Sequence, residues 1–308
     1  MVQRNISSKK VTPLSIEEII SNQYDLKIDL TNNTFKINYL LLIMEKSYDL
    51  SVGFHSLKKI RIGSILDLST VDWRGHTVFM VFCSGCNFRC PFCSNSPLIP
   101  MDSGREVDLS SVEERVLANR KFVDALGFTG GEPSLQPDSI MELCGWAKEE
   151  GLETFLNTNG SNPRLIEELS RRGLIDYVAL DVKAPLRPEV YGSIIGLNSG
   201  VEGIVENIKE VIRFCKGADL TLETRTTIAP TLIDDEKSIR EIARSVSASD
   251  LYVIQEFFPF EEVLDEKLRK LKSPEKELLL MLARSALEEG LREVYIRTRQ
   301  NGMERVTS

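Results

Sequence analysis

The stretch CSGCNFRCPFCSN, residues 83–95, contains four of the six cysteines of this chain. It follows a short β-branched and aromatic run, Thr77–Cys83, which predicts a strand. Cysteines this dense in a chain without secretory features indicate metal or redox chemistry rather than a disulfide framework. The first predicted strand therefore leads directly into the segment that contains most of the cysteines.

Further strand-like runs follow this one, and amphipathic helical patterns separate them. Several of those patterns stop at a glycine, such as Gly151 or Gly173. Six strand–helix alternations predict a parallel sheet with right-handed crossovers, an α/β fold wound as a partial (βα)6 barrel. The later runs are Leu126–Thr129, Glu153–Asn157, Tyr177–Val182, Leu220–Ile228 and Leu251–Phe257, with Glu293–Arg297 as a last strand.

The N-terminal residues read differently from this alternation. Ser15 and Glu18 fit a helix capping box, and alternating residues on both sides of an Asn-Asn turn at 32–33 predict a β-hairpin. We therefore expect a small β-rich extension over residues 1–73, a barrel over 74–300 and a tail over 301–308.

Composition excludes several classes of protein. Of the 308 residues, 42% are hydrophobic and 27% are charged, which is the balance of a globular protein with a core. The longest apolar run, Tyr39–Met44, is too short to span a bilayer, and the N-terminus shows no secretory signal. These observations predict a cytoplasmic protein that does not associate with a membrane. The net charge of −8 argues against a nucleic-acid-binding surface over the whole chain, although it does not exclude a local basic patch.

The spacing of the four cysteines permits three kinds of site. All four could hold a structural zinc, although a three-residue spacer between the two CxxC pairs makes tetrahedral closure awkward. All four could hold an iron–sulfur cluster for plain electron transfer. The third possibility omits Cys83 and uses Cys86, Cys90 and Cys93 for a [4Fe–4S] cluster with one open iron.

The pattern Cys86-x3-Cys90-x-Phe92-Cys93 resembles the signature of the radical S-adenosylmethionine (SAM) superfamily. The likeness covers residues 60–297, and further motifs follow in the family's order at successive strand ends. These are Gly130-Gly131-Glu132-Pro133, Asn157-Thr158-Asn159-Gly160, Asp181-Val182-Lys183, Thr224-Arg225-Thr226 and Gln255.

The resemblance implies a radical enzyme whose three cysteines hold the [4Fe–4S] cluster. SAM would bind the open iron and be cleaved reductively to a 5′-deoxyadenosyl radical, which abstracts a hydrogen atom. Gly130 and Gly131 would let the main chain approach the methionine amino group, which Glu132 would complement. The side chains expected around the SAM carboxylate and ribose are Thr158, Asn159, Asp181, Lys183 and Arg225. Phe92 and Gly196 would adjoin the adenine.

The residues before the first strand and the Glu223–Ile228 run narrow the resemblance to the anaerobic ribonucleoside-triphosphate reductase activating proteins. Such activases remove a hydrogen from a glycine of a partner glycyl radical enzyme, and a flavodoxin or ferredoxin would supply the electron. The alternatives are a radical SAM enzyme acting on an RNA base, a peptide or a small metabolite, or a non-catalytic iron–sulfur or zinc module. Asn157 replaces the family's Asp, which leaves Asn157, Thr158 and Asp181 as candidates for a monovalent-cation site.

Structural roles compete with these functional ones. Arg225 on a strand is also typical of a buried ion pair, and Gly-Gly before Glu-Pro is typical of a turn. Cys144 and Cys215 lie on apolar helix faces and are expected in the core. Cys83 at the strand end is expected to be structural, with a redox or ligand role as the alternative.

Overall fold

The computed structural model describes residues 58–307, so the expected helix near Ser15 and the expected hairpin at residues 26–39 lie outside the described residues. The described chain forms one ten-stranded sheet with the order β10-β9-β8-β7-β6-β5-β4-β2-β1-β3. Neighbours from β2 through β9 pair in parallel, whereas β1, β3 and β10 join the edges antiparallel. The strands are β1 (Lys59–Ser69), β2 (Val78–Cys83), β3 (Arg105–Asp108), β4 (Ala125–Gly130), β5 (Glu153–Thr158), β6 (Tyr177–Asp181), β7 (Thr221–Ile228), β8 (Leu251–Glu256), β9 (Val294–Thr298) and β10 (Gly302–Arg305).

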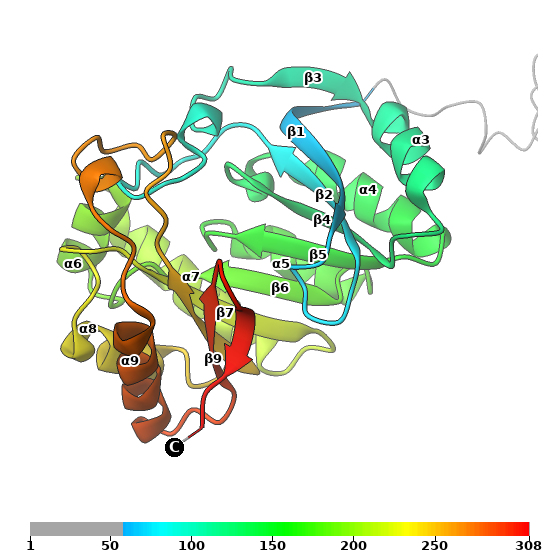
Figure 1. Cartoon of the computed structure of the whole chain (residues 1–308). Helices are drawn as coiled ribbons and strands as arrows, with labels where there is room; N and C mark the ends of the chain where they lie inside the picture. Colours follow the sequence, from blue (N-terminus) through cyan, green and yellow to red (C-terminus); the bar gives the residue numbers. More distant parts are fainter. Residues whose placement is uncertain (1–57, 308) are drawn as a thin grey trace, which may run out of the picture. The chain divides into compact units, whose positions relative to one another are not determined.

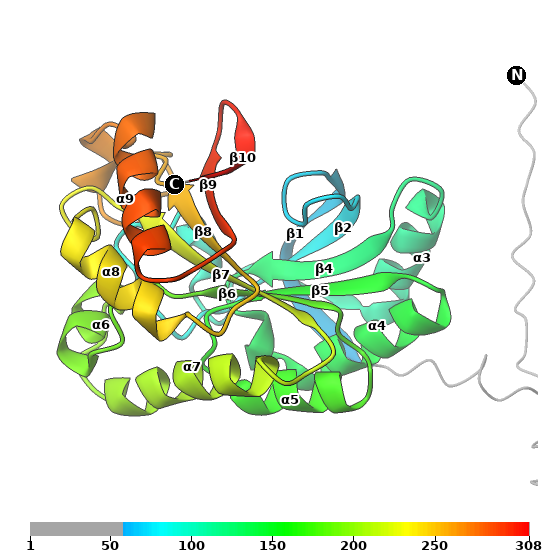
Figure 2. The same cartoon turned by 90° about the horizontal axis from the view of Figure 1, so that it is seen from below.

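The helices lie between successive parallel strands, as right-handed crossovers require. Figures 1 and 2 show a curved sheet, with α4, α5 and α7 along its outer face. The α-helices are α3 (Leu109–Asn119), α4 (Pro137–Glu149), α5 (Pro163–Arg171), α6 (Pro188–Ile195), α7 (Val201–Cys215), α8 (Glu236–Ser245) and α9 (Lys276–Glu288). Short 3-10 helices are η1 (Ser96–Leu98), η2 (Pro133–Leu135) and η3 (Leu268–Lys270). The predicted α/β alternation is therefore confirmed, and no helix within 58–307 is both long and apolar enough to cross a bilayer.

The main hydrophobic core fills the space between the sheet and its helices. The apolar face predicted for α4 is buried there, including Ile140, Leu143 and Cys144, and Cys215 of α7 is buried in the same core. Removing these apolar surfaces from water is the dominant stabilising contribution, about 25 cal/mol for each Å². The core therefore fixes the strands whose ends carry the polar motifs.

A second, smaller cluster fills the inner side of the sheet at the N-terminal ends of its strands. Trp73 is 7% exposed and stacks on His76 at 4.0 Å between ring centroids, and its ring lies 4.8 Å from that of Tyr177. We call residues 70–76, the turn between β1 and β2, the strap. It reaches distant strands, because Arg225 of β7 donates to the Asp72 carbonyl at 2.8 Å and Arg74 donates to the Tyr295 hydroxyl at 3.0 Å. The strap thereby closes this end of the barrel.

The edges of the sheet differ from the expected domain boundaries. Residues 59–69, which we assigned to the N-terminal extension, form β1 and pair with β2. Residues 302–305, which we assigned to the tail, form β10 on β9. β10 is an edge strand, whereas β1 lies between β2 and the edge strand β3. Both pair antiparallel with a strand next to them in the sequence, so their hydrogen bonds extend the sheet without an intervening helix.

Candidate functional site

The cysteine loop leaves β2 and lines a cavity of about 830 Å³ at the C-terminal ends of the parallel strands. Cys86, Cys90 and Cys93 all line this cavity, and each has a free thiol. Cys83 does not line it: it is the last residue of β2, is fully buried in the main core and has a thiol pKa raised by burial. The structure thus separates Cys83 from the three cysteines of the predicted cluster motif.

Main-chain hydrogen bonds hold the cysteine loop on several sides. The Gly85 N–H donates to the Leu98 carbonyl at 2.8 Å, and the Cys86 N–H to the Ile99 carbonyl at 3.0 Å. The Arg89 N–H donates to the Ile195 carbonyl at the end of α6, at 2.8 Å. The loop after β8 adds bonds from the Leu264 N–H to the Cys93 carbonyl at 3.1 Å and from the Asp265 N–H to the Pro91 carbonyl at 2.9 Å. These bonds fix the main chain that carries the three thiols.

The two glycines that end β4 are required by close approach to the cysteine loop. Gly130 has φ +106°, and a Cβ there would lie 2.5 Å from the Cys83 carbonyl oxygen. A Cβ on Gly131 would lie 2.2 Å from the Gly85 carbonyl oxygen. No real side chain tolerates such contacts with main-chain atoms, so the Gly-Gly pair is where β4 and the cysteine loop meet.

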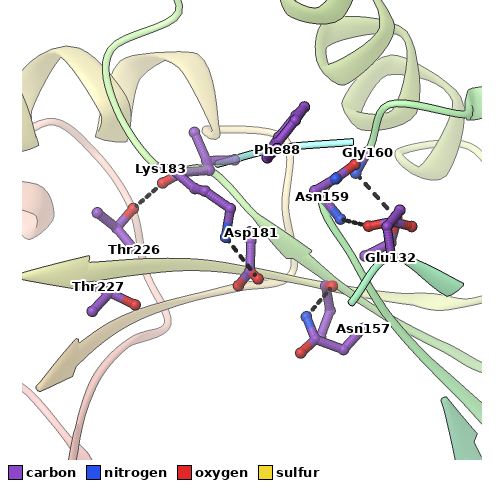
Figure 3. A network of polar contacts seen from close by, with 12 residues as sticks. Phe88, Glu132, Asn157, Asn159, Gly160, Asp181, Lys183, Thr226 and Thr227 are labelled. Carbon is purple, nitrogen blue, oxygen red and sulfur yellow. Dashed lines mark hydrogen bonds and ion pairs between the residues drawn. The ribbon is translucent and has the colours of Figure 1, made fainter. Parts of the chain in front are cut away.

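Glu132 connects the ends of β4 and β5. It is 1% exposed, and its carboxylate accepts hydrogen bonds from the Thr158 hydroxyl at 2.7 Å, the Asn159 N–H at 2.7 Å and the Ser134 N–H at 3.0 Å (Figure 3). Burial raises the pKa of this carboxyl, and the same hydrogen bonds oppose the shift. Glu132 therefore fixes the loops, with both carboxylate oxygens already engaged.

Asp181 and Lys183 form a partly exposed ion pair (Figure 3). The Lys183 ammonium lies 3.1 Å from the Asp181 carboxylate and 6.0 Å from the centroid of the Phe92 ring. Burial disfavours the charged amine, but the Asp181 carboxylate together with Cys90 and Tyr191 outweighs burial and holds the pKa of Lys183 above its usual value. Burial also raises the pKa of Cys86 to about 11 and that of Cys90 to about 12, while the Lys183 ammonium opposes both shifts.

The three residues considered for a monovalent cation already have partners. The Asn157 amide donates to the Ala179 carbonyl at 3.1 Å and accepts from the Thr129 hydroxyl at 3.1 Å. The Thr158 hydroxyl donates to Glu132, and Asp181 pairs with Lys183. In this structure the Lys183 ammonium is thus the cation beside Asp181.

Arg225 lines the cavity, but it also belongs to a buried network of charged side chains. This is the ion-pair role that its position on a strand predicts. Its side chain is 3% exposed, its Nε donates to Glu223, and Arg297 also approaches Glu223, at 3.3 Å. Tyr177 donates its hydroxyl to the same carboxylate. Two guanidinium groups therefore share one carboxylate, while Arg225 also interacts electrostatically with Asp181 and Arg297 with Asp72.

Gly196 is the predicted site residue that does not line the cavity. It ends α6 with φ +69°, and a Cβ there would lie 2.4 Å from the Arg89 carbonyl oxygen. Its role in this structure is a helix C-cap against the cysteine loop. The other predicted residues do line the cavity: Cys86, Cys90, Phe92, Cys93, Gly130, Gly131, Glu132, Thr158, Asn159, Asp181, Lys183 and Arg225.

Several cavity residues were not predicted from the sequence. Arg297 and Arg299 come from the end of β9, Phe258 and Phe260 from the loop after β8, and Asp72 from the strap. No local motif marks them, because their place in the cavity depends on the curvature of the sheet. The paired charges Glu223 and Arg225 were detectable, since residues two apart on a strand share a face.

The donor set fits a [4Fe–4S] cluster with three protein ligands. In such a cluster each thiolate binds a different iron, so its sulfurs are spaced more widely than the ligands of one ion. Within residues 58–307 no three His, Cys, Asp or Glu side chains are grouped closely enough for a single metal ion. Cys83, which a four-cysteine zinc site requires, lies in the core. The Lys183 ammonium complements the negative charge of bound thiolates.

Comparison with known proteins gives one consistent result. Residues 80–246 match the sequence model of the radical SAM superfamily. A protein of Methanocaldococcus jannaschii that carries the provisional name glycyl-radical enzyme activating enzyme is 36% identical over 240 residues, 78% of this chain and 97% of that protein. The pyruvate formate-lyase-activating enzyme of Clostridium pasteurianum is 29% identical over 247 residues, 76% of this chain and 98% of that enzyme. In fold, a radical SAM methyltransferase from Sphaerobacter thermophilus matches with a TM-score of 0.56 at 16% identity, over 73% of this chain and 67% of that one.

Proposed function

The chain belongs to the radical SAM superfamily, and on that premise we propose that it is a glycyl-radical-enzyme activase. The relatives named as activating enzymes support this proposal, because this chain spans nearly their whole length. The observation that carries it is the convergence of the cysteine loop with the motifs at the ends of β4, β5, β6 and β7 on one cavity. This arrangement places the polar groups of four strands around the three thiols.

We propose Cys86, Cys90 and Cys93 as the cluster ligands. A [4Fe–4S] cluster held by these three thiolates would supply the one-electron reduction that cleaves SAM, and so would allow a hydrogen atom to be taken from the substrate. The protein's part is to bind, orient and exclude water. Lys183 supplies a cation for the SAM carboxylate, and Thr158 and Asn159 offer polar groups held in place by Glu132.

The strap and the aromatic cluster help to exclude water from the cavity. Trp73, Phe155 and Tyr177 are buried together on the inner side of the sheet, and the strap residues Asp72 and Arg74 on either side of Trp73 line the cavity. A radical generated in such a site is protected from side reactions. We further propose that the partner is a glycyl radical enzyme, that a flavodoxin- or ferredoxin-type protein supplies the electron, and that the protein acts in the cytoplasm, where thiols stay reduced.

The test uses the full chain, reconstituted anaerobically with iron and sulfide. With dithionite as reductant we expect cleavage of SAM to 5′-deoxyadenosine and methionine. With pyruvate formate-lyase or anaerobic ribonucleotide reductase added as candidate partners, we expect the electron paramagnetic resonance doublet of a glycyl radical. Cleavage of SAM with no doublet in either partner would contradict the activase proposal, whereas no cleavage by a cluster-loaded protein would contradict the chemistry itself.

A further inference from the structure

An aromatic surface lies at the exposed side of the cavity. Phe258 and Phe260, in the loop after β8, have ring centroids 5.1 Å apart. The guanidinium carbon of Arg299, just after β9, lies 4.7 Å from the Phe258 centroid and 5.6 Å from the Phe260 centroid. All three residues line the cavity, and Phe260 remains 40% exposed. We call Phe258, Phe260 and Arg299 the rim.

Within the part of the chain that the structure describes, the partners of the Arg299 guanidinium are the two aromatic faces. Its main-chain N–H donates to the Glu256 carboxylate at 2.8 Å, which fixes the backbone. Within residues 58–307 no carboxylate lies at ion-pair distance from its guanidinium. The guanidinium donors are therefore free to bind acceptor oxygens of another molecule while the plane stays stacked.

The rim is fastened to the cysteine loop. The loop that carries Phe258 and Phe260 continues into Glu262, whose carbonyl accepts from the Ser96 hydroxyl at 2.5 Å. Two residues further on, the Leu264 N–H donates to the Cys93 carbonyl. A chain bound at the rim would thus be held at a set position relative to the three thiols.

We propose that the rim is the anchor for a segment of the partner polypeptide. An apolar or aromatic side chain beside the reacting glycine packs on Phe260, and main-chain carbonyl oxygens of the segment accept hydrogen bonds from Arg299. Exposed aromatics next to an arginine are the composition of interface hot spots. A glycine has no side chain for an enzyme to hold, so recognition has to use its neighbours. This inference rests on the proposed function and specifies what that site recognises.

The experiment compares Phe260→Ala and Phe260→Leu with a control, Phe122→Ala. Phe122 is 66% exposed just after α3, outside the cavity, so the control removes an equally large exposed ring. The probes are two peptides with a central α-deuterated glycine, Ser-Ala-Gly-Phe-Ala-Ser and Ser-Ala-Gly-Ser-Ala-Ser. Deuterium in 5′-deoxyadenosine reports hydrogen abstraction, and total 5′-deoxyadenosine formed with dithionite reports SAM cleavage.

We expect the wild type and Phe122→Ala to transfer deuterium from the Phe peptide about tenfold more efficiently than from the Ser peptide, the effect of one interface anchor. Phe260→Ala should lose this preference and Phe260→Leu should keep part of it, when deuterium transfer is expressed per 5′-deoxyadenosine formed. Equal transfer from both peptides, unaffected by Phe260→Ala, would overturn the rim proposal and leave the activase proposal standing. A change of oligomeric state on Phe260→Ala would also overturn it, because the rim would then be covered by a second copy. No deuterium transfer in any pairing, despite SAM cleavage, would contradict the proposed function itself.

Discussion

Gly131→Ala tests whether the Gly-Gly pair is the joint between β4 and the cysteine loop. The added Cβ would lie 2.2 Å from the Gly85 carbonyl oxygen, which also accepts the Glu132 N–H at 2.7 Å. Overpacking of this kind costs about 1–3 kcal/mol, and disturbing the hydrogen bond adds about 1 kcal/mol. We therefore expect the free energy of unfolding to fall by about 2–4 kcal/mol.

The matched control is Gly145→Ala, inside α4, where an added Cβ meets nothing within 4 Å. The same chemical change should there stabilise the protein by about 0.5–1 kcal/mol, because alanine favours the helix. Thermal unfolding of the metal-free proteins measures both effects. At roughly 2 °C per kcal/mol for a domain of this size, Gly131→Ala should lower Tm by about 4–8 °C.

Iron content after anaerobic reconstitution is the second readout. Gly131→Ala should bind less iron than Gly145→Ala, since Gly85 directly precedes Cys86. A Gly131→Ala protein with wild-type Tm and a full complement of iron would refute the reasoning, because the loop would then have room that the structure denies.

Two further predictions concern the cysteines and the strap. Cys90→Ala should lose the cluster and SAM cleavage, whereas Cys83→Ala should retain iron measured after reconstitution; loss of iron from the Cys83 variant would contradict its assignment to the core. Trp73→Ala removes a ring that is 7% exposed and stacked on His76, and should lower the free energy of unfolding by about 3–5 kcal/mol in chemical denaturation. A loss below about 1 kcal/mol would show that the strap does not close the barrel in solution.

The parallel strands could be predicted because each is a short run rich in apolar or β-branched residues and bounded by helical patterns. Buried on both faces, such strands have a composition that does not depend on distant partners. The antiparallel strands lack this signal. In β1, Leu66 and Leu68 are exposed, which breaks the alternation of buried apolar and exposed polar residues.

The candidate site was likewise only partly predictable from the sequence. The three thiols and the polar residues at strand ends could be placed in one cavity from their order along the chain. The sequence could not tell which of them already had protein partners. Gly196 has the positive φ of a helix C-cap, and Arg225 has a carboxylate two residues earlier on its own strand. A helix C-cap and a buried ion pair use the same residue types as a cofactor contact, so the sequence alone does not distinguish these roles.

The main-chain bonds of the cysteine loop join it to η1, to the end of α6 and to the loop after β8, which are far apart in the sequence. The positions of the three thiols therefore depend on segments that contain no cysteine. Substitutions in those segments should alter iron binding although they change no ligand, so the site is sensitive to packing at a distance from it.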